Sequence, residues 1–184
     1  MISRTHGVVL TYDDLLHMPD DRNRYELFEG VLEVTPAPGT GHQIAVLNLA
    51  VLLAGHVRRR RLGKVFVAPC DVLLSNTSVV EPDLFFVARE GRAAILPRYV
   101  QGPPDLVVEV LSPSTAQRDQ GAKRQLYAAF GVPHYWVLDP QARQVTAYVL
   151  ESGEYRQTAV ARGDEQLAAP PFPDLVIPLA ELWD

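Results

Sequence analysis

Two apolar runs in the middle of the chain carry acidic residues at positions where a covered strand is normally uncharged. Residues 79–87 read Val-Val-Glu-Pro-Asp-Leu-Phe-Phe-Val, and residues 105–111 read Asp-Leu-Val-Val-Glu-Val-Leu. This density of β-branched and aromatic residues favours buried strands. Because a buried, unpaired carboxylate is strongly unfavourable, Glu109 must be protonated, paired with a cation or bound to a metal.

Strand alternation indicates which acids lie together. Residues two apart in a strand point to the same face, so Glu81 and Asp83 share one face of the first strand, and Asp105 and Glu109 share one face of the second. Pro82 cannot donate a hydrogen bond to a neighbouring strand, which predicts a bulge or an edge there. We therefore expect the two strands to contribute to one acidic pocket.

Helical spacing and turn residues predict the remaining elements. A long helix over 42–62 is apolar nearly all round, which predicts burial, with Gly63 as its C-terminal cap. A second helix opens with a capping box at Ser114 and Gln117 and closes at Gly131. Further predictions are a short helix capped by Thr11, a hairpin over 25–34 turning at Glu29-Gly30, strands over 65–74, 134–140 and 174–179, and a hairpin joining 144–150 to 155–160.

The helix after residue 114 carries one polar face. Asp119, Lys123 and Tyr127 recur every four residues and share that face. Its apolar stripe is Ala122, Leu126 and Phe130. Two interpretations of Lys123 are open at this point: it reaches the acidic pocket, or it pairs only with Asp119 on a solvated face.

Composition and net charge exclude some classes of protein but do not identify a function. The chain has 184 residues, of which 47% are hydrophobic and 21% charged, which suits one domain over 1–184. A single cysteine, Cys70, excludes an internal disulfide and fits a reducing compartment, so we expect a cytoplasmic protein. We expect no targeting segment and no membrane-spanning run. A net charge of −5 argues against binding nucleic acid by bulk electrostatics, although divalent ions neutralise a local cluster of carboxylates.

Five motifs in this order resemble the Uma2 family of endonucleases, within the PD-(D/E)XK nuclease superfamily. They are Tyr25 to Gly30 (YELFEG), Pro82-Asp83, Glu109 to Ser114 (EVLSPS), Lys123 with Tyr127, and Gly131 to Pro140 (GVPHYWVLDP). The resemblance implies an α/β (α+β) fold, a restriction-endonuclease-like core of a mixed β-sheet flanked by helices in the order α-β-β-β-α-β, with β-hairpins added at both ends.

The same resemblance implies a set of site residues. Asp83 and Glu109 would hold Mg²⁺ or Mn²⁺ with the backbone carbonyl of Val110, and Lys123 would be the catalytic cation. In the common superfamily pattern a Lys lies two residues after the second acid, whereas this chain has Leu111 there, so Lys123 must reach the site from its helix.

Three supporting residues and two arginines complete the candidates. Tyr127 and His42 match the family pattern, although a capping or solvated role for His42 is open. Glu26 is either an exposed hairpin carboxylate or a wall of the pocket. Arg58 and Arg59 either complement the helix dipole or contact phosphate.

Three functions follow for such a chain. The first is a metal-dependent endonuclease that cuts DNA, acting as a homodimer because nucleases of this superfamily often pair and because Tyr148, Tyr155, Phe172 and Trp183 are candidates for exposed apolar contacts. The second is a non-catalytic binding or assembly protein on an inactivated nuclease fold, which Leu111 and the acidic balance favour. The third is a hydrolase of small phosphoesters.

Overall fold

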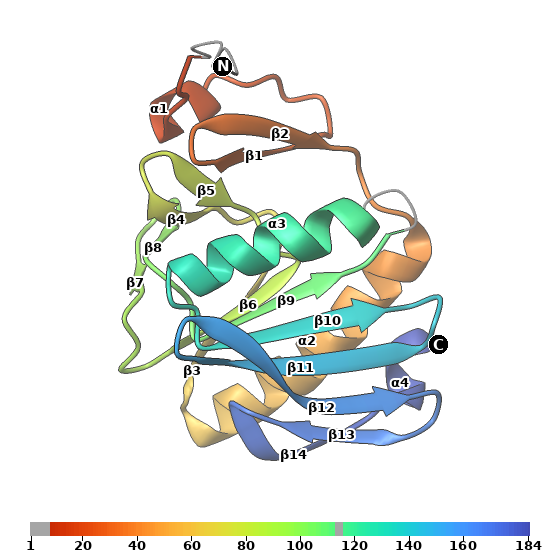
Figure 1. The fold of residues 1–184 in the computed structure, drawn as a ribbon. Helices are drawn as coiled ribbons and strands as arrows, with labels where there is room; N and C mark the ends of the chain where they lie inside the picture. The colour runs from red at the N-terminus through yellow and green to blue at the C-terminus, as the bar shows by residue number, and fades with distance from the viewer. Residues whose placement is uncertain (1–7, 113–115) are drawn as a thin grey trace.

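Two six-stranded sheets and two long helices form the framework of the protein (Figure 1). The computed structural model describes residues 8–112 and 116–184. Sheet A, in the order β2-β1-β5-β4-β8-β7, consists of β1 (Arg24–Phe28), β2 (Val31–Thr35), β4 (Val72–Ser75), β5 (Ser78–Val80), β7 (Ala94–Ile95) and β8 (Val100–Gln101). Sheet B, in the order β12-β11-β10-β9-β6-β3, consists of β3 (Gly63–Val67), β6 (Leu84–Ala88), β9 (Leu106–Val110), β10 (His134–Asp139), β11 (Gln144–Glu151) and β12 (Glu154–Arg162).

Sheet B is covered on both faces, which explains its continuous apolar strands. Helix α2 (Thr40–Arg60) packs on the face that carries Leu84 and Phe86, and helix α3 (Ala116–Ala129) packs on the face that carries Phe85 and Val87. Strand β9 runs parallel to β10, with α3 as the connection, and antiparallel to β6. The predicted α-β-β-β-α-β core is therefore confirmed as α2-β3-β6-β9-α3-β10.

The two predicted hairpins are confirmed as β1–β2 and β11–β12. Glu29 and Gly30 both have positive φ, as a two-residue hairpin turn of this hand requires, and so do Ser152 and Gly153. At the other end of the chain, β13 (Gln166–Ala169), β14 (Phe172–Pro178) and α4 (Ala180–Trp183) pack on the α2 side of sheet B. Helix α1 (Tyr12–Leu15) begins where predicted, because the Thr11 N–H donates to Asp14 Oδ2 at 2.8 Å.

Two predicted strands are each divided between the sheets. Residues 65–74 form β3 in sheet B and β4 in sheet A, and residues 79–87 form β5 in sheet A and β6 in sheet B. The breaks contain Pro69 and Pro82, which cannot donate to a strand ladder. The bulge or edge predicted at Pro82 is thus a crossover between sheets. Apolar periodicity does not specify which sheet a strand joins, so the sequence could not reveal this division.

Helix α2 differs from its prediction in three ways. It is not buried all round, because Ile44, Leu47 and Val51 expose 40%, 63% and 64% of their surface. It ends in a left-handed Arg61, not in a Gly63 cap. Gly63 instead allows close packing, since a Cβ there would lie 2.1 Å from the Val87 carbonyl oxygen. By length and composition alone, α2 is long and apolar enough to cross a bilayer, so the expectation that the chain has no such run is wrong. In this structure the buried face of α2 covers sheet B.

Candidate active site

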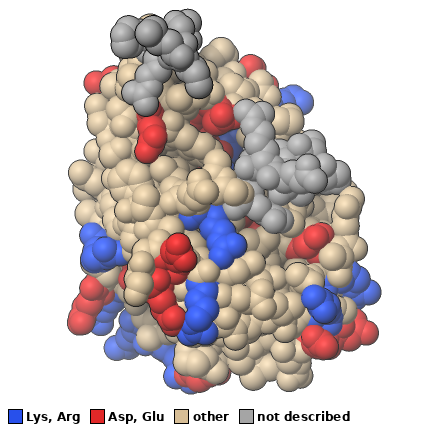
Figure 2. Space-filling view, viewed as in Figure 1, with Lys and Arg blue, Asp and Glu red and all other residues tan. Residues whose placement is uncertain are grey.

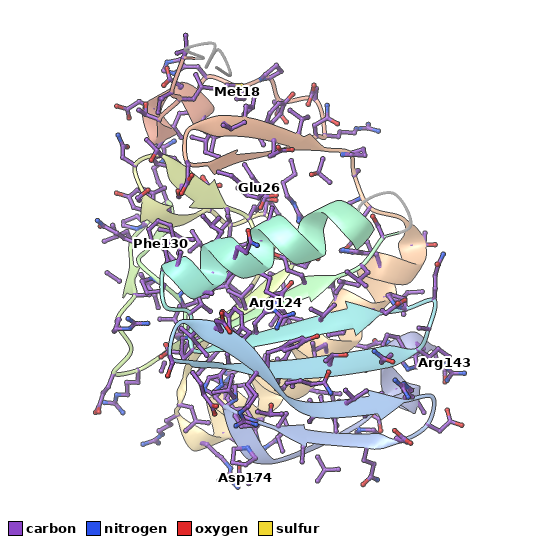
Figure 3. All side chains as sticks on the ribbon, in the orientation of Figure 1. Met18, Glu26, Arg124, Phe130, Arg143 and Asp174 are labelled. Carbon is purple, nitrogen blue, oxygen red and sulfur yellow. The ribbon has the colours of Figure 1, made fainter. Side chains whose placement is uncertain are left out.

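Four carboxylates meet where the chain crosses from sheet A to sheet B. Glu26 comes from β1, Glu81 and Asp83 flank Pro82 just before β6, and Glu109 comes from β9. Figure 3 shows Glu26 between the β1–β2 hairpin and α3. Only 2% of Glu26 is exposed, so it is a wall of the pocket and not a hairpin surface carboxylate.

Asp83 has a partner on each oxygen. Its Oδ1 accepts a hydrogen bond from Arg24 Nη1 at 2.9 Å, and its Oδ2 accepts bonds from His42 Nε2 at 3.0 Å and from the Val110 N–H at 2.8 Å. Burial acts to raise the pKa of Asp83, but the bond from His42, the charge of Arg24 and the bond from Val110 outweigh burial and lower the pKa to about 2. Asp83 is therefore a fixed, ionised carboxylate.

Glu109 is paired from α3. Lys123 Nζ lies 3.3 Å from both carboxylate oxygens, and the Tyr127 hydroxyl donates to Oε1 at 2.5 Å. Burial raises the pKa of Glu109 to about 7, although the charge of Lys123 and the bond from Tyr127 act in the opposite direction. Burial and the neighbouring Glu109 also raise the pKa of Tyr127, which stays a hydrogen-bond donor. Glu109 thus titrates near neutral pH, unlike Asp83.

Lys123 connects the two sheets. Its Nζ lies 3.1 Å from Glu26 Oε1 as well as 3.3 Å from Glu109, and only 4% of the residue is exposed. Pairing with Asp119 alone on a solvated face is therefore excluded by burial; the Asp119 side chain lies outside the described residues. Burial acts to lower the pKa of Lys123, but Glu109 and Glu26 raise it well above its ordinary value. Lys123 stays charged at neutral pH.

The faces of α3 differ from the prediction. Lys123 and Tyr127 lie on the buried face with Leu126, whereas Ala122 is exposed. The Lys123 stem is covered by protein, and its ammonium lies in the acidic pocket beside Glu26 and Glu109. The predicted capping box at Ser114 lies outside the described residues.

Sequence reasoning missed one residue of the site, Arg24. Arg24 Nε lies 2.9 Å from Glu81 Oε1, so one guanidinium binds both Glu81 and Asp83. Burial acts to lower the pKa of Arg24, but Asp83 and the other acids raise it; burial raises the pKa of Glu81. Strand parity contained the signal, because Arg24 and Glu26 are two residues apart on β1 and therefore share a face.

The donor chemistry of the site suits a hard divalent cation. Counted formally, four carboxylates against the two cations Arg24 and Lys123 leave a charge of −2 when Glu109 is ionised. Carboxylate oxygens are the ligands that Mg²⁺ and Mn²⁺ prefer. Within the described residues, however, no three His, Cys, Asp or Glu side chains are arranged around one point, and cations contact Asp83 and Glu109. The residues fit a metal chemically, provided that a cation gives way.

The other predicted contacts lie elsewhere. Val110 contributes its N–H to Asp83, whereas the prediction concerned its carbonyl. Arg58 and Arg59 lie about 24 Å along α2 from His42, at 1.5 Å per residue, so they do not reach the carboxylates. Arg58 instead lines a hollow of about 840 Å³ with Arg61, Lys64 and Arg89. Tyr155 and Phe172 are buried, whereas Tyr148 and Trp183 are partly buried, so these four side chains expose less apolar surface than the homodimer prediction assumed.

Comparison with known proteins identifies the family of this chain. The model of the Uma2 family, described as "Putative restriction endonuclease", matches residues 12–180. The chain belongs to the Uma2 family. All of the carboxylates and cations described above lie within the matched range, including Arg24 and Glu81.

A solved structure shares the fold of this Uma2 family member. It is a putative nuclease belonging to DUF820 from Anabaena variabilis, with a TM-score of 0.75, 21% sequence identity, and coverage of 95% of this chain and 97% of that chain. Among curated proteins, no sequence matches this Uma2 chain.

Proposed function

We propose that this protein is a metal-dependent endonuclease that hydrolyses phosphodiester bonds of DNA. The family description and the nuclease with the same fold support a nuclease in general. The observation that carries the proposal is the position of Lys123, whose ammonium contacts Glu109 and Glu26 within the acidic pocket that also holds Asp83. This ammonium supplies the positive charge that Leu111 cannot.

Asp83 and Glu109, with the carbonyl of Val110, would hold Mg²⁺ or Mn²⁺. Bound there, the ion would supply Lewis-acid stabilisation of the phosphoryl group and lower the pKa of a coordinated water. Asp83 is prepared for this role because His42 and the Val110 N–H fix its orientation. Tyr127 fixes Glu109 in the same way.

The raised pKa of Lys123 defines its role. A lysine that stays protonated at neutral pH is a poor acceptor for the proton of a water molecule. It is instead a point charge that contacts a phosphate oxygen and stabilises the negative charge that builds up during hydrolysis. We infer that Lys123 is an electrostatic catalyst and not the general base.

Charge on the surface limits how tightly nucleic acid can bind. On the face drawn in Figure 2, Lys and Arg side chains are scattered among acidic ones, without a broad basic surface. With a net charge of −5, binding must rely on a few phosphate contacts and the neutralised metal site. We expect modest affinity for DNA that falls as salt concentration rises.

The decisive experiment is plasmid nicking with Mg²⁺ or Mn²⁺ beside isothermal titration with Mn²⁺. Wild type should bind Mn²⁺ and nick DNA, Asp83→Asn and Glu109→Gln should do neither, and Lys123→Met should keep metal binding while losing nicking. Nicking that survives Glu109→Gln would reveal a contaminant. Metal binding without any cleavage of nucleic acid would favour the non-catalytic binding protein. RNA substrates in parallel test the choice of DNA, and light scattering tests the homodimer, which stays a prediction.

A further inference from the structure

Arg24 occupies a position inside the carboxylate cluster that the proposed reaction does not use. It lies at the start of β1, and its side chain is 16% exposed. Nε lies 2.9 Å from Glu81 Oε1, and Nη1 lies 2.9 Å from Asp83 Oδ1. Because Pro82 separates the two acids, their side chains point the same way, and one forked guanidinium holds both.

The oxygen that Arg24 holds differs from the other oxygens of the site. Asp83 Oδ2 is bound by the Val110 N–H, a backbone group, and by His42. Glu109 is held by Lys123 and Tyr127, which are both buried. Among the described residues, Asp83 Oδ1 has Arg24 as its hydrogen-bond partner. A divalent ion can therefore reach Oδ1 by displacing one side chain, without rearranging the backbone.

Arg24 also has a second carboxylate on which to remain. If Nη1 leaves Asp83, Nε keeps Glu81, so the guanidinium is not left unpaired in a mostly buried place. The cluster charge of −2 with Arg24 present would be balanced by the incoming ion, and repulsion between the ion and Arg24 would favour their separation.

We propose that Arg24 is an exchangeable counter-cation: it holds Asp83 Oδ1 in the metal-free protein and releases that oxygen to a divalent cation while remaining bound to Glu81. This inference rests on the proposed metal-dependent function. The opposing account is that Arg24 is a permanent clamp that orients Asp83 for the metal. The two accounts predict opposite effects of removing the guanidinium.

Isothermal titration of Mn²⁺ into metal-free wild type, Arg24→Gln and Asp83→Asn distinguishes them. A cation within ~4–6 Å changes the proton affinity of a carboxylate by roughly 1–3 pKa units, and we expect a comparable change in metal affinity. Arg24→Gln should therefore bind Mn²⁺ at least ~10-fold more tightly than wild type. Arg143→Gln is the matched control, because Arg143 pairs with Asp164 away from the cluster, and it should bind as wild type does.

Two further results keep the test decisive. Arg24→Lys retains the charge but cannot bridge two carboxylates, so its affinity should lie between those of wild type and Arg24→Gln; if Arg24→Gln does not fold, this comparison alone decides. Unchanged or weaker Mn²⁺ binding in the folded Arg24 variants would overturn the inference. Absence of binding in wild type, or full binding in Asp83→Asn, would instead overturn the proposed metal site.

Discussion

Glu109 combines a buried position with a pKa of about 7, so the state of the site changes over the physiological pH range. The folded pKa lies above the ordinary value of 4.5. Protonated Glu109 therefore favours the folded state below pH 4.5, and this contribution is lost as pH rises through 7. Asp83 behaves in the opposite way, because its pKa is lowered. Ionised Asp83 stabilises the folded state above pH 3.8, and this contribution is lost as pH falls towards 2.

Metal affinity should report this titration. A metal ligand must lose its proton, so protonation of Glu109 competes with Mn²⁺. With a pKa of about 7, the ionised fraction of Glu109 changes roughly tenfold between pH 8 and pH 6, and we expect Mn²⁺ affinity to fall by about the same factor. Isothermal titration at the two pH values and constant ionic strength measures this change. Equal affinity at both values would show that Glu109 is already ionised or is not a ligand.

Loss of Lys123 should strongly destabilise the metal-free protein. Lys123→Met leaves Glu109 and Glu26 buried without their cation, and removing one partner of a buried pair costs about 3–5 kcal/mol. The loss should be smaller at pH 6 than at pH 8, because protonation of Glu109 removes one of the two charges. Urea unfolding at both pH values measures it.

The control for this experiment is Arg143→Met, which breaks the exposed pair with Asp164. Exposed pairs contribute little, so its effect should be small and independent of pH over the same interval. A loss in Lys123→Met that matched the control would mean that the buried pair contributes no more than a surface pair.

At the scale of elements, Gly63 shows how closely β3 and β6 approach each other within sheet B. A Cβ at this position would meet the Val87 carbonyl oxygen at 2.1 Å, and backbone cannot move aside as a side chain can. We expect Gly63→Ala to destabilise the protein by about 1–3 kcal/mol in thermal or urea unfolding. Gly41→Ala, in the first turn of α2 with open space around its Cβ, should be neutral or slightly stabilising. Similar effects of the two substitutions would contradict the packing argument.

Elements could be predicted from the sequence where one local signal decided them. The Glu29-Gly30 turn, the paired apolar strands of β11 and β12, and the acids on either side of Pro82 lie where alternation and turn chemistry place them. The exposed stripe of α2 could not be predicted, because a helix of apolar residues does not show which face meets a sheet. The division of residues 65–74 and 79–87 between sheets depends on partners distant in sequence.

The carboxylates of the site could be predicted from the sequence more readily than its cations. An acid in an apolar strand is unusual and draws attention to Asp83 and Glu109, whereas an arginine in a hairpin, such as Arg24, is ordinary. Burial of Lys123 also depends on how α3 lies on sheet B. The spacing of polar residues along α3 predicts the wrong buried face, since Lys123 faces inward and Ala122 outward. Cations are therefore identified by three-dimensional contacts, and acids by their sequence context.

At the scale of the molecule, sheet A depends on sheet B for its stability. The buried cluster that sheet A forms with α1 consists of Tyr12, Leu15, Leu27 and Val79, whereas the α2 side of sheet B has 21 buried members among the described residues. Three more residues of sheet A, Val72, Val80 and Val100, are buried in the cluster that contains Phe85 and Val107 of sheet B. The cluster that sheet A forms with α1 buries too little apolar surface to offset the conformational entropy of six strands, so sheet A needs the contacts that it makes with sheet B. The connection between the sheets runs through the site, where Lys123 on α3 pairs with Glu26 on β1.

We therefore expect both sheets to unfold together, which also tests the prediction of one domain over 1–184. Amide hydrogen exchange should give similar opening free energies for β1 and β5 in sheet A and for β9 and β10 in sheet B. In wild type, Mn²⁺ at 100 times its dissociation constant should raise the opening free energies of both sheets by about 2.7 kcal/mol. In Asp83→Asn, Mn²⁺ should leave both opening free energies unchanged. Glu26→Gln weakens the bridge to Lys123 and should lower the opening free energies of the two sheets by similar amounts. Early exchange of sheet A in wild type, unaffected by metal, would show instead that the two sheets are independent folding units joined by the crossover at Pro82.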